Sequence, residues 1–126
     1  MSRKVPALPG DEANSLPFSQ VVEANGFVFL AGQVGNRPGE PNATPGGIGP
    51  ETRQMLDNVG RLLEAVGLSY RDVVKTTVYL RDFTEFEAMN AVFREYFPSE
   101  PPTRATVGVT ALAHDFRVEI EVMAAR

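Results

Sequence analysis

The chain has 126 residues, of which 43% are hydrophobic, so it is long enough to form one domain, 1–126, with its own core. Sixteen acidic and twelve basic residues give a net charge of −4, and because Lys and Arg form no block, we expect no nucleic acid partner. The absence of cysteine excludes disulfides, a thiol nucleophile and thiolate metal ligands, and the longest nearly apolar run, at 26–35, is far too short to span a bilayer. A soluble cytoplasmic protein without membrane contact is therefore expected.

The first predicted element is a β-hairpin. Its strands are FSQVVEA at 18–24 and FVFLAGQV at 27–34, joined by Asn25 and Gly26. Asn-Gly supplies the positive φ angles that a tight primed turn needs. Residues 35–49 are turn-forming almost throughout and predict a surface loop. Whether this loop closes over a ligand site is left open.

Two amphipathic helices are predicted next, with the strand DVVKTTVYL at 72–80 between them. After Pro50, apolar residues recur at helical spacing until Gly67, a C-terminal stop: Met55, Leu56, Val59, Leu62, Leu63 and Val66. Thr84 and Glu87 form a capping box that opens the second helix. Its apolar stripe consists of Phe86, Met89, Val92, Phe93, Tyr96 and Phe97, and Pro98 ends it.

The last two predicted strands, at 103–109 and 116–123, decide where the charged residues lie. Side chains alternate between the two faces of a strand. In the second strand the apolar set, Phe116, Val118, Ile120 and Val122, lies opposite Glu119. In the first, Thr103, Ala105, Val107 and Val109 suit a covered face, so Arg104 takes the other one. With both helices on one face of the sheet, we expect Arg104 and Glu119 to share the helix-free face.

The helix-free face is itself predicted to be partly apolar, because both sides of the strand at 27–34 carry apolar residues. Such a face needs another subunit to cover it. Two interpretations of Arg104 then remain: a solvated charge on a strand, or a charge in a cleft between subunits that binds an anionic ligand.

Six blocks of the sequence resemble the Rid family (RidA/YjgF-type reactive intermediate deaminases) over residues from about 16 to 124: PFSQ at 17–20, GFVFLAGQVG at 26–35, ETRQMLDNVGRLLEAVGLSYRDVVKTTVYLRDF at 51–83, FEAMNAVFREYF at 86–97, PPTRATV at 101–107 and VEIEVMA at 118–124. The resemblance implies an α+β, chorismate-mutase-like (YjgF-type) mixed β-sheet with two helices packed on one face. It further implies a homotrimeric barrel with three ligand clefts between subunits. The implied activity is hydrolysis of 2-imino acids, formed from enamines such as 2-aminoacrylate, to 2-keto acids and ammonia, without metal or organic cofactor.

The resemblance also implies the site residues. Arg104 is assigned to the substrate carboxylate, which a guanidinium can bind through two parallel hydrogen bonds. Glu119 is assigned to the attacking water, since imine hydrolysis needs a group that passes protons. The backbone at Thr106 is assigned to the ligand. Phe18 stands where many members have tyrosine and Ala31 where a serine is common, and Gly32 adjoins them, so the pocket is more apolar here.

Two other functions remain open at this stage: a noncatalytic module that binds small carboxylates or keto acids, and an RNA-directed translation inhibitor. Glu119 also has a structural interpretation, as an ordinary strand-face charge. Gln33, beside Gly32, could shape the pocket or mark a bulge. We expect Asn90 to make a structural hydrogen bond and His114 to be a solvated turn residue rather than a general base.

Overall fold

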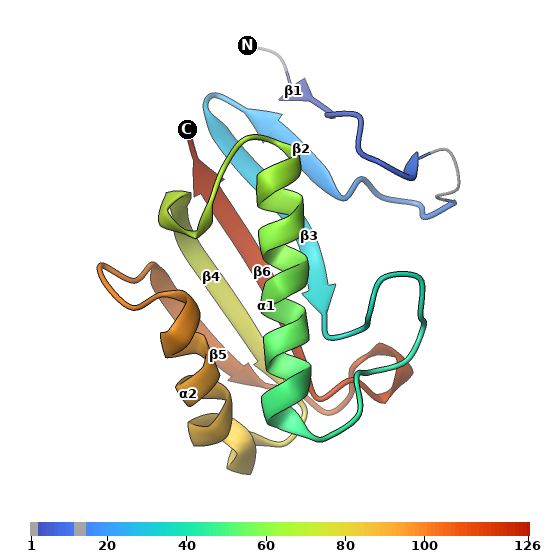
Figure 1. Ribbon diagram of the computed structural model, residues 1–126, viewed down its shortest axis with the longest axis vertical. Helices are drawn as coiled ribbons and strands as arrows, with labels where there is room; N and C mark the ends of the chain where they lie inside the picture. The colour runs from blue at the N-terminus through green and yellow to red at the C-terminus, as the bar shows by residue number, and fades with distance from the viewer. Residues whose placement is uncertain (1–2, 12–14) are drawn as a thin grey trace.

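The computed structural model describes residues 3–11 and 15–126, which form one six-stranded sheet with two helices on one face (Figure 1). The strands are β1 (Arg3–Lys4), β2 (Val21–Ala24), β3 (Phe27–Val34), β4 (Val73–Leu80), β5 (Thr103–Gly108) and β6 (Val118–Ala125). Their order across the sheet is β1-β2-β3-β6-β4-β5, with β4 and β5 parallel and the other described neighbours antiparallel. The predicted α+β class and mixed sheet are confirmed.

The predicted hairpin is formed by β2 and β3, which pair from Val21 with Leu30 to Ala24 with Phe27. Asn25 and Gly26 have φ angles of 53° and 81°, as a primed turn requires. Strand β1 adds two residues to the outer edge of β2 and was not predicted, because a two-residue polar segment carries no periodicity.

Helix α1 (Ile48–Ala65) begins two residues before Pro50, slightly earlier than predicted. Pro50 lies in the first turn, where backbone N–H groups have no helical acceptor, so its missing N–H costs no hydrogen bond. The helix ends at Ala65, and the predicted stop Gly67 follows the C-cap Val66 with a φ of 80°. The N–H of Gly67 donates to Glu64 O and that of Leu68 to Leu63 O, the paired bonds of a Schellman ending.

Helix α2 (Phe86–Tyr96) is preceded by a 3₁₀ turn (Phe83–Glu85), and the predicted capping box of Thr84 is wrong. Asp82 caps this segment instead. Its Oδ1 accepts hydrogen bonds from the Thr84 N–H (3.0 Å) and the Thr84 hydroxyl (2.7 Å). The charged Asp82 carboxylate is a stronger hydrogen-bond acceptor than the Thr84 hydroxyl that was predicted to cap the helix. The helical segment therefore begins at Phe83, before the predicted start.

The hydrophobic core lies between the sheet and the two helices. From the sheet it takes Val28, Leu30, Val78, Leu80, Val118, Ile120 and Val122, and from the helices Met55, Leu56, Val59, Leu63, Met89, Val92 and Phe93. Each such side chain contributes about 1.5–3 kcal/mol through burial. The apolar periodicity predicted for both helices and for β6 therefore faces the core, and Glu119 points away from it.

The predicted faces of β5 are wrong. Arg104 pairs in register with Thr76 and Thr106 with Val78, two β4 residues that are 1% and 0% exposed beneath the helices. Residues opposite each other in neighbouring strands point to the same side. Arg104 and Thr106 therefore lie on the helix-covered face, and Val107 is 42% exposed on the other.

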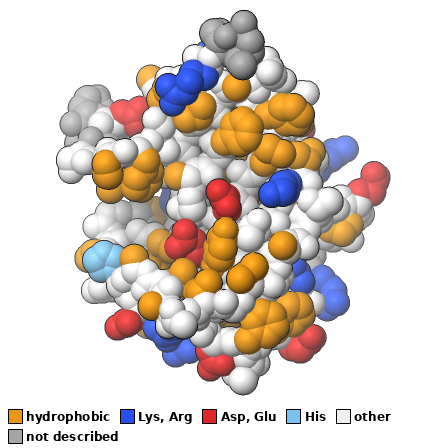
Figure 2. Space-filling model, turned by 180° about the vertical axis from the view of Figure 1, so that it is seen from behind, with side chains coloured by type: hydrophobic (Ala, Val, Ile, Leu, Met, Phe, Trp, Pro, Cys, Tyr) orange, Lys and Arg blue, Asp and Glu red, His pale blue; other side chains and the backbone are white. Residues whose placement is uncertain are grey.

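The helix-free face of the sheet carries apolar side chains among charged ones, as Figure 2 shows from behind. Phe27, Phe29 and Val107 each leave 42% of their surface exposed there. The predicted partly apolar face is thus confirmed. Among the described helices, none is both long and apolar enough to cross a bilayer.

Candidate active site

Glu119 on β6 projects from the helix-free face. It is half-buried, and its neighbours in register are Val34 on β3 and Tyr79 on β4. Its carboxylate lies over Gly32, where an added Cβ would overlap Oε2. The pairing of β3 with β6 shifts between Leu30 and Gln33, so a bulge places Gly32 beneath the carboxylate. A side chain at position 32 would therefore push the Glu119 carboxylate out of this position.

The Glu119 carboxylate makes no hydrogen bond or ion pair with any residue that the structure describes. Burial raises the pKa of this carboxyl above its ordinary value, and the negative charge of Glu121 raises it further. Glu121 is held nearby by Tyr79, whose hydroxyl donates to its Oε1 at 3.2 Å. A carboxyl with a raised pKa and no partner can both accept and return a proton, as acid–base catalysis requires.

Glu119 shares an open pocket of about 500 Å³ with Phe18, Ala31 and Gly32, all of which the sequence singled out. Phe18 is 53% exposed, so its ring forms a wall of the pocket without being part of the core. A smaller pocket of about 260 Å³ continues from Gly32 and Glu119 towards Tyr79. Four of the six predicted site residues are thus assembled around one carboxyl group.

Arg104 on the edge strand β5 is not part of that pocket. Its guanidinium carbon lies 4.7 Å from the ring centroid of Phe93 and 5.5 Å from that of Phe86, both on α2. No carboxylate in the described part of the chain lies within ion-pairing distance of it. Burial lowers the pKa of the guanidinium, and the nearby charge of Arg94 lowers it further. A bound anion would relieve both effects.

Arg104 and Glu119 lie on opposite faces of the sheet within one chain, which corrects the expectation that they share one face. Arg104 is in register with buried Thr76, whereas Glu119 is in register with Tyr79. Thr106 follows Arg104 on the helix-covered side of the edge strand. One chain therefore carries two partial sites: an acid–base pocket at Glu119, and a cationic edge at Arg104 and Thr106.

Three further residues that the sequence analysis considered do not line the Glu119 pocket: Gln33, His114 and Asn90. Gln33 donates through Nε2 to Gln20 Oε1 (3.1 Å) and to the backbone oxygen of Ala31 (3.0 Å), which braces the bulge. His114 is exposed with φ of 52°, which confirms that it is a solvated turn residue. The hydrogen bond expected of the Asn90 side chain is not found among the described residues.

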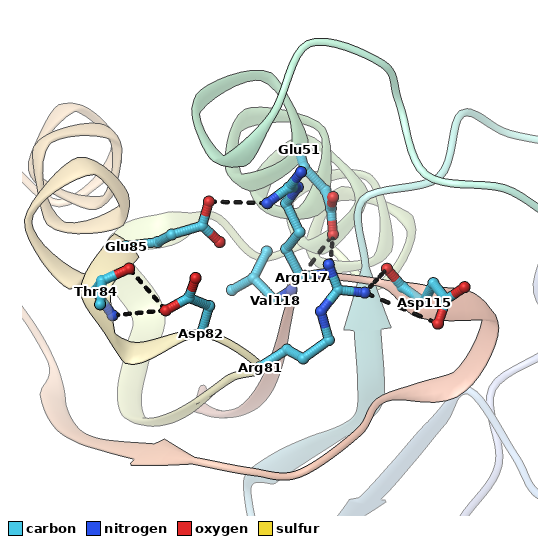
Figure 3. A network of polar contacts seen from close by, with 8 residues as sticks. All are labelled: Glu51, Arg81, Asp82, Thr84, Glu85, Asp115, Arg117 and Val118. Carbon is cyan, nitrogen blue, oxygen red and sulfur yellow. Dashed lines mark hydrogen bonds and ion pairs between the residues drawn. The ribbon is translucent and has the colours of Figure 1, made fainter.

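Glu51, which the sequence analysis did not single out, holds the start of β6 in place (Figure 3). It is 2% exposed, and its Oε2 accepts from the backbone N–H groups of Arg117 (2.6 Å) and Val118 (3.3 Å). Arg117 in turn forms an ion pair with Glu85 at 2.9 Å. Glu51 lies one turn before Met55 on the buried side of α1, and that spacing is the signal that could have revealed it.

No three His, Asp or Glu side chains within residues 3–11 and 15–126 gather so as to hold a metal ion. The two partial sites together offer one carboxyl, one guanidinium, and apolar or backbone surface. They suit a small anionic substrate whose reaction proceeds by proton transfer.

Comparison with known proteins agrees with the fold. A family model described as endoribonuclease L-PSP matches residues 11–126. A 2-iminobutanoate/2-iminopropanoate deaminase from Mus musculus is 41% identical over 108 residues, covering 86% of this chain and 80% of the relative. A RutC family protein from Pyrococcus horikoshii is 44% identical over 108 residues, 86% of each chain.

Solved structures extend the match. The YjgF gene product from E. coli has a TM-score of 0.83 and 33% identity, covering 90% of this chain and 91% of that one. A conserved Rid family protein from Yersinia pestis has a TM-score of 0.88 and 29% identity, covering 99% and 100%. Together with the family model, these relatives show that the chain belongs to the endoribonuclease L-PSP family and is a RidA/YjgF-type protein.

Proposed function

We propose that this protein is an imine deaminase, which hydrolyses 2-imino acids to 2-keto acids and ammonia. The observation that carries the proposal is the half-buried Glu119 carboxyl, which has no described partner and faces a pocket lined by Phe18, Ala31 and Gly32. Relatives about 40% identical over 86% of the chain carry the name 2-iminobutanoate/2-iminopropanoate deaminase.

Arg104 binds the substrate carboxylate in this proposal. Its guanidinium is half-buried without a counter-ion among the described residues, a state that an anionic ligand stabilises. Two parallel N–H···O bonds would fix the plane of the carboxylate and hence the position of the neighbouring imine carbon. Backbone groups near Thr106, on the unpaired side of the edge strand, are available to the same ligand.

A single substrate can contact both Arg104 and Glu119 only if the two residues come from different chains, because they lie on opposite faces of one sheet. We therefore propose a homotrimer with a site at each junction. The apolar helix-free face, with Phe27, Phe29 and Val107 each 42% exposed, supports such an assembly.

The proposed reaction needs only water and proton transfer. Glu119 accepts a proton from water as the water oxygen bonds to the imine carbon, and it passes a proton to the nitrogen. The resulting carbinolamine loses ammonia as its hydroxyl becomes the keto group, with Glu119 again moving the proton. Because its pKa is raised, the Glu119 carboxylate is a stronger proton acceptor than that of an ordinary glutamate, and at a given pH more of it is protonated and ready to return the proton. No step uses a metal or organic cofactor.

The substrate side chain would contact Phe18 and Ala31. Both are apolar, and neither offers the hydroxyl group that a tyrosine or serine would supply. We therefore propose a preference for imines with larger apolar side chains. An added methylene or two in such a pocket changes specificity by about 10-fold.

The test is deamination of imines generated in situ from amino acids, followed by semicarbazide trapping, for wild type and Glu119→Gln. The variant keeps the size of the side chain but removes its proton acceptor, so turnover should fall about 10²-fold or more. Binding of 2-oxobutanoate should largely persist. Full activity in Glu119→Gln would contradict the assignment.

Imine turnover, ligand binding and RNA cleavage together separate the alternative functions. A noncatalytic carboxylate-binding module would bind 2-oxobutanoate but turn over no imine in the wild type. An RNA-directed activity, which the family description names, is measured by incubating wild type and Glu119→Gln with single-stranded RNA. The net charge of −4 disfavours it, since RNA binding draws on basic surface.

A further inference from the structure

Among the described residues, the Arg104 guanidinium rests on two aromatic rings of α2. The guanidinium carbon is 4.7 Å from the Phe93 ring centroid and 5.5 Å from that of Phe86. Phe93 is 5% exposed, and its ring packs on Phe97 at 4.7 Å between centroids. Phe97 in turn makes an edge contact with Tyr70 at 5.7 Å. The Phe93 ring is therefore fixed by the core and offers Arg104 a rigid surface.

An aromatic ring supports a guanidinium differently from a carboxylate. A carboxylate takes up the N–H donors and neutralises the charge, so it competes with an anionic ligand. A ring is attracted to the cation through its π face and leaves the N–H groups in the guanidinium plane free. The observed contacts thus fix the position of Arg104 while keeping its donors and its charge available.

We propose that Phe93, assisted by Phe86, is a positioning residue that holds the Arg104 guanidinium ready for the substrate carboxylate. This inference rests on the proposed function, because it assumes that Arg104 binds the carboxylate. Phe93 acts through Arg104, so its loss should weaken carboxylate binding and raise KM while kcat stays close to that of the wild type.

The experiment compares leucine substitutions of two buried phenylalanines. Phe93→Leu removes the ring beneath Arg104, whereas Phe116→Leu removes a ring of similar burial, 3% exposed, that has no described contact with Arg104 or Phe93. Affinity for 2-oxobutanoate is measured by calorimetry, and KM and kcat by imine hydrolysis. Phe93→Leu should weaken affinity about 10-fold and raise KM about 10-fold, in keeping with a partly desolvated cation–π contact, and Phe116→Leu should change either quantity by less than about 2-fold.

Two more variants keep the test decisive. Phe93→Tyr retains the ring and should restore affinity to within about 2-fold of wild type. If Phe93→Leu fails to fold, Phe86→Leu, which is partly exposed at the start of α2, should weaken affinity about 3-fold.

The possible outcomes separate this inference from the proposed function. Equal effects of Phe93→Leu and Phe116→Leu, with strong loss in Arg104→Ala, would overturn the role of Phe93 and leave the deaminase assignment standing. Unchanged affinity and turnover in Arg104→Ala would overturn the roles of both Arg104 and Phe93, whereas no imine turnover in the wild type would overturn the proposed function itself. An effect of Phe93→Leu on kcat alone, with affinity unchanged, would also contradict a role in positioning the carboxylate-binding group.

Discussion

Mixing two inactive variants tests whether each site is shared between chains. Arg104→Ala removes the cation on the helix-covered face of the sheet, and Glu119→Gln removes the carboxyl on the other face. In a ring of three chains, each site would take Arg104 from one chain and Glu119 from the next. A site is intact when its Arg104 comes from a Glu119→Gln chain and its Glu119 from an Arg104→Ala chain.

The expected recovery of activity follows from the fraction of sites that are intact in mixed trimers. In random trimers from an equal mixture, each of the two conditions is met half of the time, so about one quarter of the sites are intact. If both residues acted within one chain, no site would be intact. A second mixture, of wild type with the double variant, gives the opposite contrast: about one quarter for a shared site and about one half for a site within one chain.

The assay is imine hydrolysis with semicarbazide trapping after co-refolding the two variants with different tags. Tandem affinity purification verifies that mixed trimers have formed, and each variant refolded alone gives the background. Recovery no greater than this background, in preparations that contain mixed trimers, would refute the shared site. It would then follow that no active site combines Arg104 of one chain with Glu119 of another.

Four further predictions follow from the same contacts. Arg104→Lys keeps the charge but loses the planar fork, so imine turnover should fall nearly as far as in Arg104→Ala. Phe18→Tyr adds a hydroxyl to the pocket wall and should narrow the roughly 10-fold preference for leucine-derived over alanine-derived imines in competition assays. Burial and a neighbouring carboxylate raise the pKa of Glu119 in the folded state above its unfolded value of 4.5. The folded state therefore loses stability as pH rises from 4.5 through the folded-state pKa, whereas below 4.5 the carboxyl is protonated in both states and costs nothing. Glu119→Gln should therefore raise Tm at pH 8, with a gain that shrinks as pH falls towards 4.5. Glu51→Ala leaves two backbone N–H groups at the start of β6 without their acceptor, which should lower the free energy of unfolding in urea by about 1–3 kcal/mol.

Alternation and turn chemistry predicted much of the fold. The strictly alternating Val118, Ile120 and Val122 placed β6 correctly, because a central strand has one face in the core and the other outside it. Asn25 and Gly26 located the hairpin for a local reason, their positive φ angles. Both signals are contained within a few neighbouring residues, so no knowledge of the rest of the chain was needed.

The orientation of β5 was predicted wrongly because it is an edge strand beside an aromatic helix. Hydropathy placed Ala105 and Val107 inside and Arg104 outside. In the structure, the charged end of Arg104 rests on two rings of α2, while Ala105 and Val107 face the other side of the sheet. Hydropathy scales treat arginine as polar throughout and give no credit for an aromatic surface beneath it.

The two partial sites are positioned by separate parts of the fold. Glu119 is held by β6, whose start is fixed by Glu51 on α1, whereas Arg104 is held by β5 and the rings of α2. Because the carboxyl and the guanidinium lie on opposite faces of one sheet, the distance between them in the proposed site depends on how two chains pack. Exposed apolar residues outside the Glu119 pocket, such as Phe27, would then affect catalysis through assembly. In the proposed trimer, the apolar face of the sheet therefore contributes to catalysis by setting the distance between the carboxyl and the guanidinium.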